Sequence, residues 1–337
     1  MLLRVLVVRI LHLIPVLLGV SLIVFSFIHL TPGDPIEMMM GEAGGVTEEE
    51  IDALRHQFGL DRPLPFQYVR FVVNAARGDL GISITDQRPV AEVIRERIPA
   101  TVELTFCSLL IALIVAIPIG IISAWRQHSA LDTGATVGTL LGVSLPGFWL
   151  GIVLIMIFSM RLEWLPVTAR VDYGVGFSSI TGFYLIDSIV TGNSAALASA
   201  LRHLVLPSMA LGAATAAITT RIMRSSMLGV IRQDYILFAR AKGLSETAIA
   251  LRHALKNALI PVVSVVGLQI GVLLGGNMII ETVFGWPGLG RLAVDAIYAR
   301  NYPVVQGVVL LYAVTYVFVN LVTDLLYAVL NPRIELR

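Results

Sequence analysis

Charged residues are scarce in this sequence. Asp, Glu, Lys and Arg make up 14% of its 337 residues, whereas the apolar types reach 56%. Soluble domains carry about 25% charged residues, so this composition excludes an ordinary soluble protein and predicts one that crosses a membrane several times. Cysteine is nearly absent: Cys107 is the one example, and it lies in an apolar run. The sequence therefore excludes an internal disulfide and a multi-thiolate metal site, and we expect Cys107 to be a small packing residue.

Catalytic and nucleotide-binding motifs are missing as well. No Gly-Lys pair occurs, which excludes the phosphate loop Gly-x-x-x-x-Gly-Lys-Ser/Thr and ATP binding by that route. The six histidines form no pair at ligand spacing on one helix, and no Ser/His/Asp set falls on one side of the membrane. We therefore expect a protein that is not an enzyme and that has no metal site, no cofactor and no nucleic-acid partner.

Long apolar runs are what the sequence has in abundance. At 1.5 Å per residue, six stretches can cross a hydrocarbon core of about 30 Å. They are residues 9–30, 101–124, 133–160, 203–224, 258–280 and 304–330. The shorter run 180–190 carries Asp187 and predicts an external or interfacial helix. The expected fold is all-α, with six transmembrane helices and both termini on one side; the first apolar run is too long for a signal peptide.

Basic residues indicate the orientation. With the termini inside, the inside pieces 1–9, 125–132, 221–257 and 331–337 hold 12 Lys and Arg residues against four acids. The outside pieces hold the other 12 basic residues against 17 acids. Short cytosolic loops carry the excess of Lys and Arg, so we expect both termini in the cytosol.

Four regions follow from these spans. Residues 1–30 form the cytosolic N-terminal end and the first transmembrane helix, and residues 31–100 form an extracytoplasmic segment too small for a core of its own. Residues 101–331 form a five-helix core with a cytosolic loop at 225–257, and residues 332–337 form a cytosolic tail.

Residues 234–261 form a basic polar segment between two expected spans. Asp234 can N-cap a first helix, and Gly243 suits the left-handed conformation that ends it. Ser245 and Glu246 can begin a second helix, since its first turn favours negative charge. The pattern predicts two short helices that meet at Gly243, in a hairpin that a cytosolic partner binds; the alternative is an ordinary basic loop.

This segment resembles the cytoplasmic EAA loop of bacterial ABC-importer permeases. Its sequence, Asp-Tyr-x-x-x-Ala-Arg-Ala-Lys-Gly followed by His-Ala-Leu-x-Asn-Ala, is similar to the dipeptide/oligopeptide branch. It departs from the broader pattern at Leu237, where a glutamate is usual, and at Lys256, where a proline is usual. The resemblance implies an ATPase-coupling surface, made of Asp234, Tyr235, Ala239, Arg240, Ala241, Lys242, Gly243, Leu244, Ser245, Glu246, His253 and Asn257.

Further motifs extend the resemblance over essentially the whole chain. They are residues 32–35, 58–61, 78–81, 181–187, 281–291 and 301–306. Together they are similar to the B-type permease subunit of dipeptide/oligopeptide importers, an inner-membrane component of binding-protein-dependent transport with the type I ABC importer permease fold. That resemblance implies a bacterial cytoplasmic membrane location, a heterodimer with a second permease, two ABC ATPase subunits and an extracytoplasmic solute-binding protein.

Other cargos and other classes stay open at this point. The same importer class carries glutathione, nickel chelates and other small solutes. A secondary transporter needs membrane-embedded ionisable relays or inverted repeats, and a membrane enzyme needs a clustered catalytic set; neither pattern is visible.

Polar residues inside the fifth span are candidates for the translocation path. Gln269 and Asn277 are neutral, and we place them near the face that carries Gly267, Gly271 and Gly275. They either face an aqueous path or hydrogen-bond to another helix. The glycine face either lines a subunit interface or packs within the subunit.

Two acids lie near the ends of spans. Glu103 begins the second expected span and Asp324 lies near the end of the sixth. We expect both to reach water from there, since a charge at a span end is close to the membrane surface.

Overall fold

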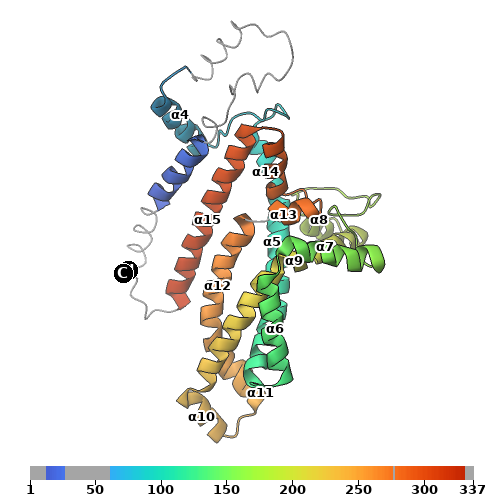
Figure 1. The fold of residues 1–337 in the computed structure, drawn as a ribbon, viewed down its shortest axis with the longest axis vertical. Helices are drawn as coiled ribbons and strands as arrows, with labels where there is room; N and C mark the ends of the chain where they lie inside the picture. The colour runs from blue at the N-terminus through green and yellow to red at the C-terminus, as the bar shows by residue number, and fades with distance from the viewer. Residues whose placement is uncertain (1–12, 27–60, 276–277, 331–337) are drawn as a thin grey trace. The chain divides into compact units, whose positions relative to one another are not determined.

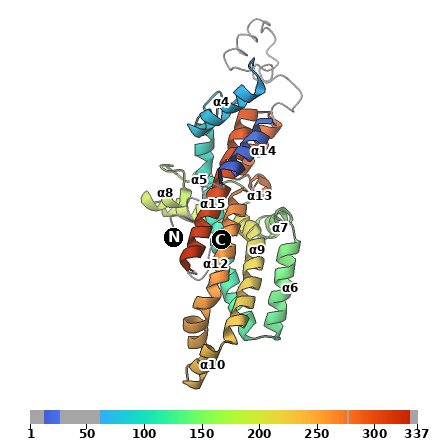
Figure 2. The same cartoon turned by 90° about the vertical axis from the view of Figure 1, so that its left-hand side faces the viewer.

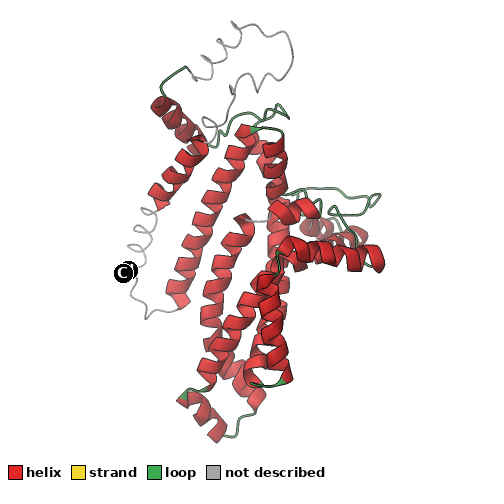
Figure 3. Ribbon diagram, viewed as in Figure 1, coloured by secondary structure: helices red, strands yellow, loops and turns green. Residues whose placement is uncertain are grey.

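The structure is a computed structural model that describes residues 13–26, 61–275 and 278–330. In these ranges it is built from helices, and the β-structure is limited to one isolated bridge between Ile82 and Pro89 (Figure 3). The all-α fold class is therefore confirmed for the described part of the chain.

The chain divides into two compact units. The first comprises Met1–Ile98 and Leu292–Thr315, and the second comprises Pro99–Arg291 and Tyr316–Arg337. The expected hairpin lies wholly in the second unit. Three helices contribute residues to both units: α5 (Val90–Trp125), α14 (Leu289–Tyr298) and α15 (Tyr302–Leu330).

In the first unit, an apolar helix at Leu13–Ser26 packs against α4 (Leu64–Ala76). The Tyr68 hydroxyl lies 2.9 Å from the Ser21 hydroxyl, and the Tyr68 ring meets Phe25 edge-on at 5.5 Å between centroids. The expected extracytoplasmic segment is described from residue 61 onward; the motifs at 32–35 and 58–61 fall mostly outside the described residues.

Helix α9 (Ser194–Ile231) is the centre of the second unit. It begins where the Asn193 side chain accepts a hydrogen bond from the Ala196 amide at 2.9 Å. Half of its most apolar window is buried, against 22–28% for the other long helices. Its neighbours are α6 (Ala130–Ser144), α7 (Gly147–Leu154), α8 (Tyr184–Val190) and α12 (Leu255–Gly275) (Figures 1 and 2).

Buried apolar clusters fix the neighbours of α9. In one cluster, Met223 and Met227 of α9 pack with Ala124 of α5 and Ala258 of α12. In another, Leu206 of α9 packs with Phe284, which follows the short helix α13 (Met278–Val283). Since apolar helices in a membrane associate through close van der Waals packing, these clusters hold the helices together.

The structure contains most of the expected spans. Four described helices are long and apolar enough to cross a membrane: Val90–Trp125, Ser194–Ile231, Glu246–Gly275 and Tyr302–Thr323. They cover the expected second, fourth, fifth and sixth spans. The first expected span, 9–30, is described as a helix at Leu13–Ser26 and its ends lie outside the described residues, so the count of six stays a prediction.

The third expected span, 133–160, is wrong as one continuous helix. Helix α6 ends at Ser144, and a second helical segment, α7 continued by the π-helix η1 (Ile155–Arg161), leaves at 106° to it. The residue before a proline is disfavoured in the helical conformation, and Leu145 adopts ψ 129° ahead of Pro146. The proline also lacks the N–H that a continuous helix needs.

The expected external helix is short, as its sequence indicated. Helix α8 has seven residues and is too short to cross a membrane. The tail at 332–337 lies outside the described residues.

Candidate functional site

The first arm of the predicted hairpin is α10 (Asp234–Ala241). Gly243 has φ +78°, so the left-handed position expected from the sequence is confirmed. Asp234 is not the N-cap: that position falls on Gln233, whose side chain makes no capping bond, and Asp234 opens the first turn. Its negative charge still favours the helix start, since the exposed amides there carry partial positive charge.

The second arm begins as expected but does not end as a short helix. The Ser245 hydroxyl accepts from the Ala248 amide at 3.3 Å, and Glu246 lies in the first turn of α11 (Glu246–Ala248). The arm then continues through the π-helix η2 (Ile249–Ala254) into α12, as one helix of 30 residues. The Ala- and Leu-rich sequence up to residue 260 has no helix breaker, so the hairpin arm and the span are one element.

Polar contacts hold the two arms together. The Arg240 guanidinium donates to both carboxylate oxygens of Glu246, at 2.9 and 3.2 Å, across the turn. At the base, the Asn257 amide donates to the Tyr235 hydroxyl at 2.7 Å. Arg240 also lies over the ring of Trp125, 6.0 Å from its centroid. These contacts give the hairpin a defined shape before any partner binds.

An apolar base seats the hairpin on the helix bundle. Ile236 is fully buried and Ala239 is buried beside it, three residues apart on one face of α10. They pack in the cluster that contains Met223 and Met227 of α9, and Ile249 from the second arm joins them. Ala239 is therefore a packing residue, whereas we had expected it on the contact surface.

The other predicted site residues share one exposed end of the second unit. They are Asp234, Tyr235, Arg240, Ala241, Lys242, Gly243, Leu244, Ser245, Glu246, His253 and Asn257.

Three exposed apolar residues were missed by the sequence analysis. Leu237, Phe238 and Leu251 are 53%, 62% and 55% exposed, on a segment that is otherwise basic and polar. The helical repeat could have found two of them: with Ile236 and Ala239 turned inward, Leu237 and Phe238 must turn outward. Apolar side chains beside charged ones are typical of a protein-binding surface.

The predicted path residues are less well placed. Gln269 is half-buried on α12, and Asn277 lies outside the described residues. Our placement of Gln269 with the glycines is wrong, because two residues along a helix turn a side chain by about 200°. Gly267 and Gly271 instead pack against Thr323 and Tyr316 of α15, so these two glycines serve packing within the subunit.

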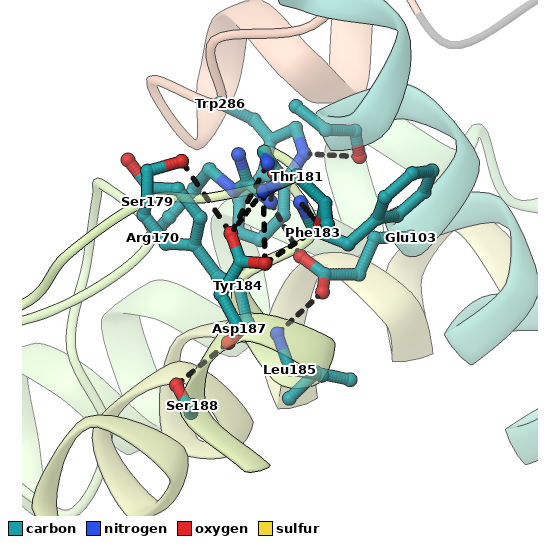
Figure 4. Close-up of polar contacts among 12 residues, drawn as sticks. Glu103, Arg170, Ser179, Thr181, Phe183, Tyr184, Leu185, Asp187, Ser188 and Trp286 are labelled. Atoms are coloured by element: carbon teal, nitrogen blue, oxygen red, sulfur yellow. Dashed lines mark hydrogen bonds and ion pairs between the residues drawn. The ribbon is translucent and has the colours of Figure 1, made fainter. Parts of the chain in front are cut away.

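Glu103 is buried and does not reach water as expected. It is 5% exposed and forms an ion pair with Arg170, whose Nη2 lies 2.6 Å from its carboxylate (Figure 4). The Leu185 amide donates to Glu103 at 2.8 Å, and the Arg170 guanidinium lies 3.6 Å from the centre of the Tyr184 ring. The sequence did not show this pair, because Arg170 lies 67 residues away in a loop.

Asp187 closes the same loop. It is fully buried and accepts hydrogen bonds from the Thr181 hydroxyl and from the amides of Ile180, Thr181 and Gly182, at 2.6 to 3.1 Å (Figure 4). Burial alone would raise the pKa of Asp187, but these hydrogen bonds together lower it. Asp187 therefore stays charged at pH values low enough to protonate an ordinary aspartate.

The described residues offer no group of three His, Cys, Asp or Glu side chains that could hold a metal ion.

The hairpin lies in the stretch of sequence that identifies the family. Residues 116–336 match the family described as "Binding-protein-dependent transport system inner membrane component". Residues 2–105 match the N-terminal region of such membrane components. The chain belongs to this family. It is thus a multi-pass permease, a transport component and not an enzyme, and it works with a solute-binding protein and an ATPase.

Curated relatives match the permease over nearly its whole length. The di/tripeptide transport system permease protein DppB of Pseudomonas aeruginosa is 45% identical over 323 residues, which cover 96% of each chain. The dipeptide transport system permease protein DppB of Escherichia coli K12 is 44% identical, again over 96% of each chain. The glutathione transport system permease protein GsiC of Escherichia coli O6:H1 is 42% identical over 97% of each chain.

Proposed function

We propose that this permease carries dipeptides or short oligopeptides across the bacterial cytoplasmic membrane, as one subunit of an ATP-driven importer. The observation that carries the proposal is the hairpin: an exposed and basic projection with exposed apolar residues, seated on α9 and continuous with α12. Its sequence is the one that resembles the ATPase-coupling loop of peptide importers, and named peptide permeases are 44–45% identical over 96% of the chain.

In this proposal the hairpin docks on a cytosolic ATPase subunit, and both termini are cytosolic. A second permease completes the path as a heterodimer, two ATPases drive it, and an extracytoplasmic binding protein delivers the cargo. Gln269 and Asn277 supply neutral hydrogen-bonding groups to the path, of the kind that tolerates peptides with different side chains.

A second cargo class has its own support. The glutathione permease GsiC is 42% identical over 97% of the chain, close to the values for the peptide permeases. Glutathione is itself a short peptide, so the same path could serve it; a nickel chelate has no such support among these relatives. The resemblance of the hairpin to an ATPase-coupling loop argues against a secondary transporter.

Uptake by the reconstituted complex tests the proposal. The permease, its partner permease, its ATPases and its binding protein are placed in lipid vesicles, and uptake of dipeptides, tripeptides, glutathione and a nickel chelate is compared. We expect uptake of dipeptides or short oligopeptides only when ATP and the binding protein are both present. Uptake of glutathione or the nickel chelate with no response to any other peptide would contradict the peptide proposal and leave the importer class intact.

A further inference from the structure

An ion pair joins α6 to α9 near the hairpin. Arg224 of α9 donates from Nε and Nη2 to the two carboxylate oxygens of Asp132, at 2.6 and 2.8 Å. The Ser123 hydroxyl of α5 donates to the same carboxylate, and the His128 amide donates to it at 3.0 Å. Asp132 is 4% exposed and the Arg224 side chain is 29% exposed, so a buried carboxylate and a partly exposed guanidinium tie three helices at one point.

This point is directly connected to the base of the hairpin. Arg224 lies between Met223 and Met227, and both methionines are fully buried against Ile236 and Ala239 of the hairpin. On α5, Ser123 is followed by Ala124 of the same cluster and by Trp125, which meets Arg240 of the hairpin. The start of α6, the end of α9 and α10 lie at the same end of the second unit (Figures 1 and 2).

Beyond the ion pair, α6 stays in contact with α9 but leaves one side of that contact open. A side-chain carbon added at Gly134 or Gly138 would meet no atom within 4 Å, whereas one added at Gly142 would lie 3.0 Å from Ala217. An open groove of about 550 Å³ lies there, lined by residues of α5, α6 and α9. Helix α6 is thus tied by Asp132 near its start, packed again at Gly142, and followed by the 106° bend at Pro146.

From this arrangement we propose that Asp132 and Arg224 are positioning residues that pass a movement of the hairpin to α6 and its bend. The proposal rests on the proposed function, because it assumes that an ATPase moves the hairpin. A bidentate pair at the hairpin end of α6 transmits a displacement directly, whereas the apolar contacts along the rest of α6 and α9 would let the two helices slide past each other without it. The pair therefore sets the amount of solute taken up for each ATP molecule that is hydrolysed.

The ratio of uptake to ATP hydrolysis tests the pair. In the reconstituted importer, Asp132→Asn and Arg224→Gln should each lower this ratio by roughly two- to thirtyfold, the range typical of coupling residues. Binding-protein-stimulated hydrolysis and co-purification of the ATPases should persist. The double variant should lose no more than either single variant, because the two residues act as one unit. Arg224→Lys, which keeps the charge and loses the bidentate geometry, should fall between wild type and Arg224→Gln.

Arg221→Gln is the matched control, because Arg221 is exposed three residues earlier on α9. Its ratio should equal that of the wild type. A wild-type ratio in every assembled variant of Asp132 and Arg224 would overturn the proposal, and so would losses in the two single variants that add in the double variant. Arg224→Lys provides the same comparison if a charge-removing variant does not assemble. Failure of the wild-type complex to take up any peptide would instead contradict the proposed function, so the two failures are distinguishable.

Discussion

Glycine serves two different purposes in this permease. Gly243 supplies a backbone conformation, with φ +78° and no atom within 4 Å of an added side-chain carbon. Gly267 supplies space, because an added carbon would collide with the Thr323 side chain of α15. The sequence predicted the first purpose from the hairpin pattern; it could not decide the second, since Thr323 lies 56 residues after Gly267.

Gly243→Val should disable transport without preventing insertion. Valine in the left-handed region costs about 1 kcal/mol or more, and the strain falls on the turn that presents the tip to its partner. We expect normal amounts of the variant in the membrane and little or no uptake. Gly174→Val is the control, because Gly174 has φ +87° and equally open surroundings in the loop before α8, away from the hairpin. Wild-type uptake by Gly243→Val would show that transport does not depend on the hairpin turn.

Gly267→Val should destabilise the purified permease by about 1–3 kcal/mol, the usual cost of overpacking a close contact. The measurement is thermal unfolding in detergent. Gly275→Val, on the same helix, meets no atom within 4 Å and should unfold at nearly the wild-type temperature. Equal unfolding temperatures for the two variants would show that α12 and α15 are not in close contact there.

At the scale of elements, apolar periodicity and length predicted helices well but not their continuity. The third expected span bends at Pro146, a feature that the pre-proline rule could have revealed in the sequence. The second hairpin arm runs into α12 because nothing between Glu246 and Leu259 ends a helix. The ion pairs of Glu103 with Arg170 and of Asp132 with Arg224 were not predictable, because each joins residues 67 or more positions apart.

Breaking the Glu103–Arg170 pair should loosen the loop that precedes α8. Arg170→Leu leaves the buried Glu103 carboxylate without its cation, which typically costs about 3–5 kcal/mol. We expect a lower unfolding temperature and faster proteolysis between residues 164 and 183. The double variant Glu103→Leu, Arg170→Leu should recover much of the loss, because it leaves no buried charge.

The control for this prediction is an exposed pair. Arg88 and Glu96 lie 2.5 Å apart, but their side chains are 47% and 56% exposed. Arg88→Leu should cost roughly 0–1 kcal/mol, as surface pairs do. If Arg170→Leu behaved like Arg88→Leu, the buried pair would not be what holds the loop.

At the scale of the whole molecule, composition and motifs predicted the class of protein, and the family match confirmed it. The all-α fold and the hairpin were predictable because membrane burial and loop charge leave clear patterns in a sequence. The cargo was not derivable from any pocket, since the two candidate path residues carry no charge and one lies outside the described residues. The count of six spans and the placement of the termini stay predictions.

Cysteine labelling in intact cells tests the orientation. In a Cys107→Ser background, Tyr173→Cys should react with a membrane-impermeant thiol reagent, and Ser245→Cys should react only after the membrane is opened. Both positions are exposed in the structure, so access depends on the side of the membrane alone. Labelling of Ser245→Cys in intact cells, with Tyr173→Cys protected, would show that the orientation is the opposite of the predicted one.

Cross-linking at the hairpin tip tests the central claim, that this surface docks the ATPase. A photoreactive amino acid replaces Leu244, which is 41% exposed, in the assembled importer in its membrane. The same amino acid at the fully exposed Tyr173 serves as the control. We predict a covalent product with the ATPase subunit from position 244 and none from position 173. An ATPase product from position 173, with none from position 244, would contradict the account.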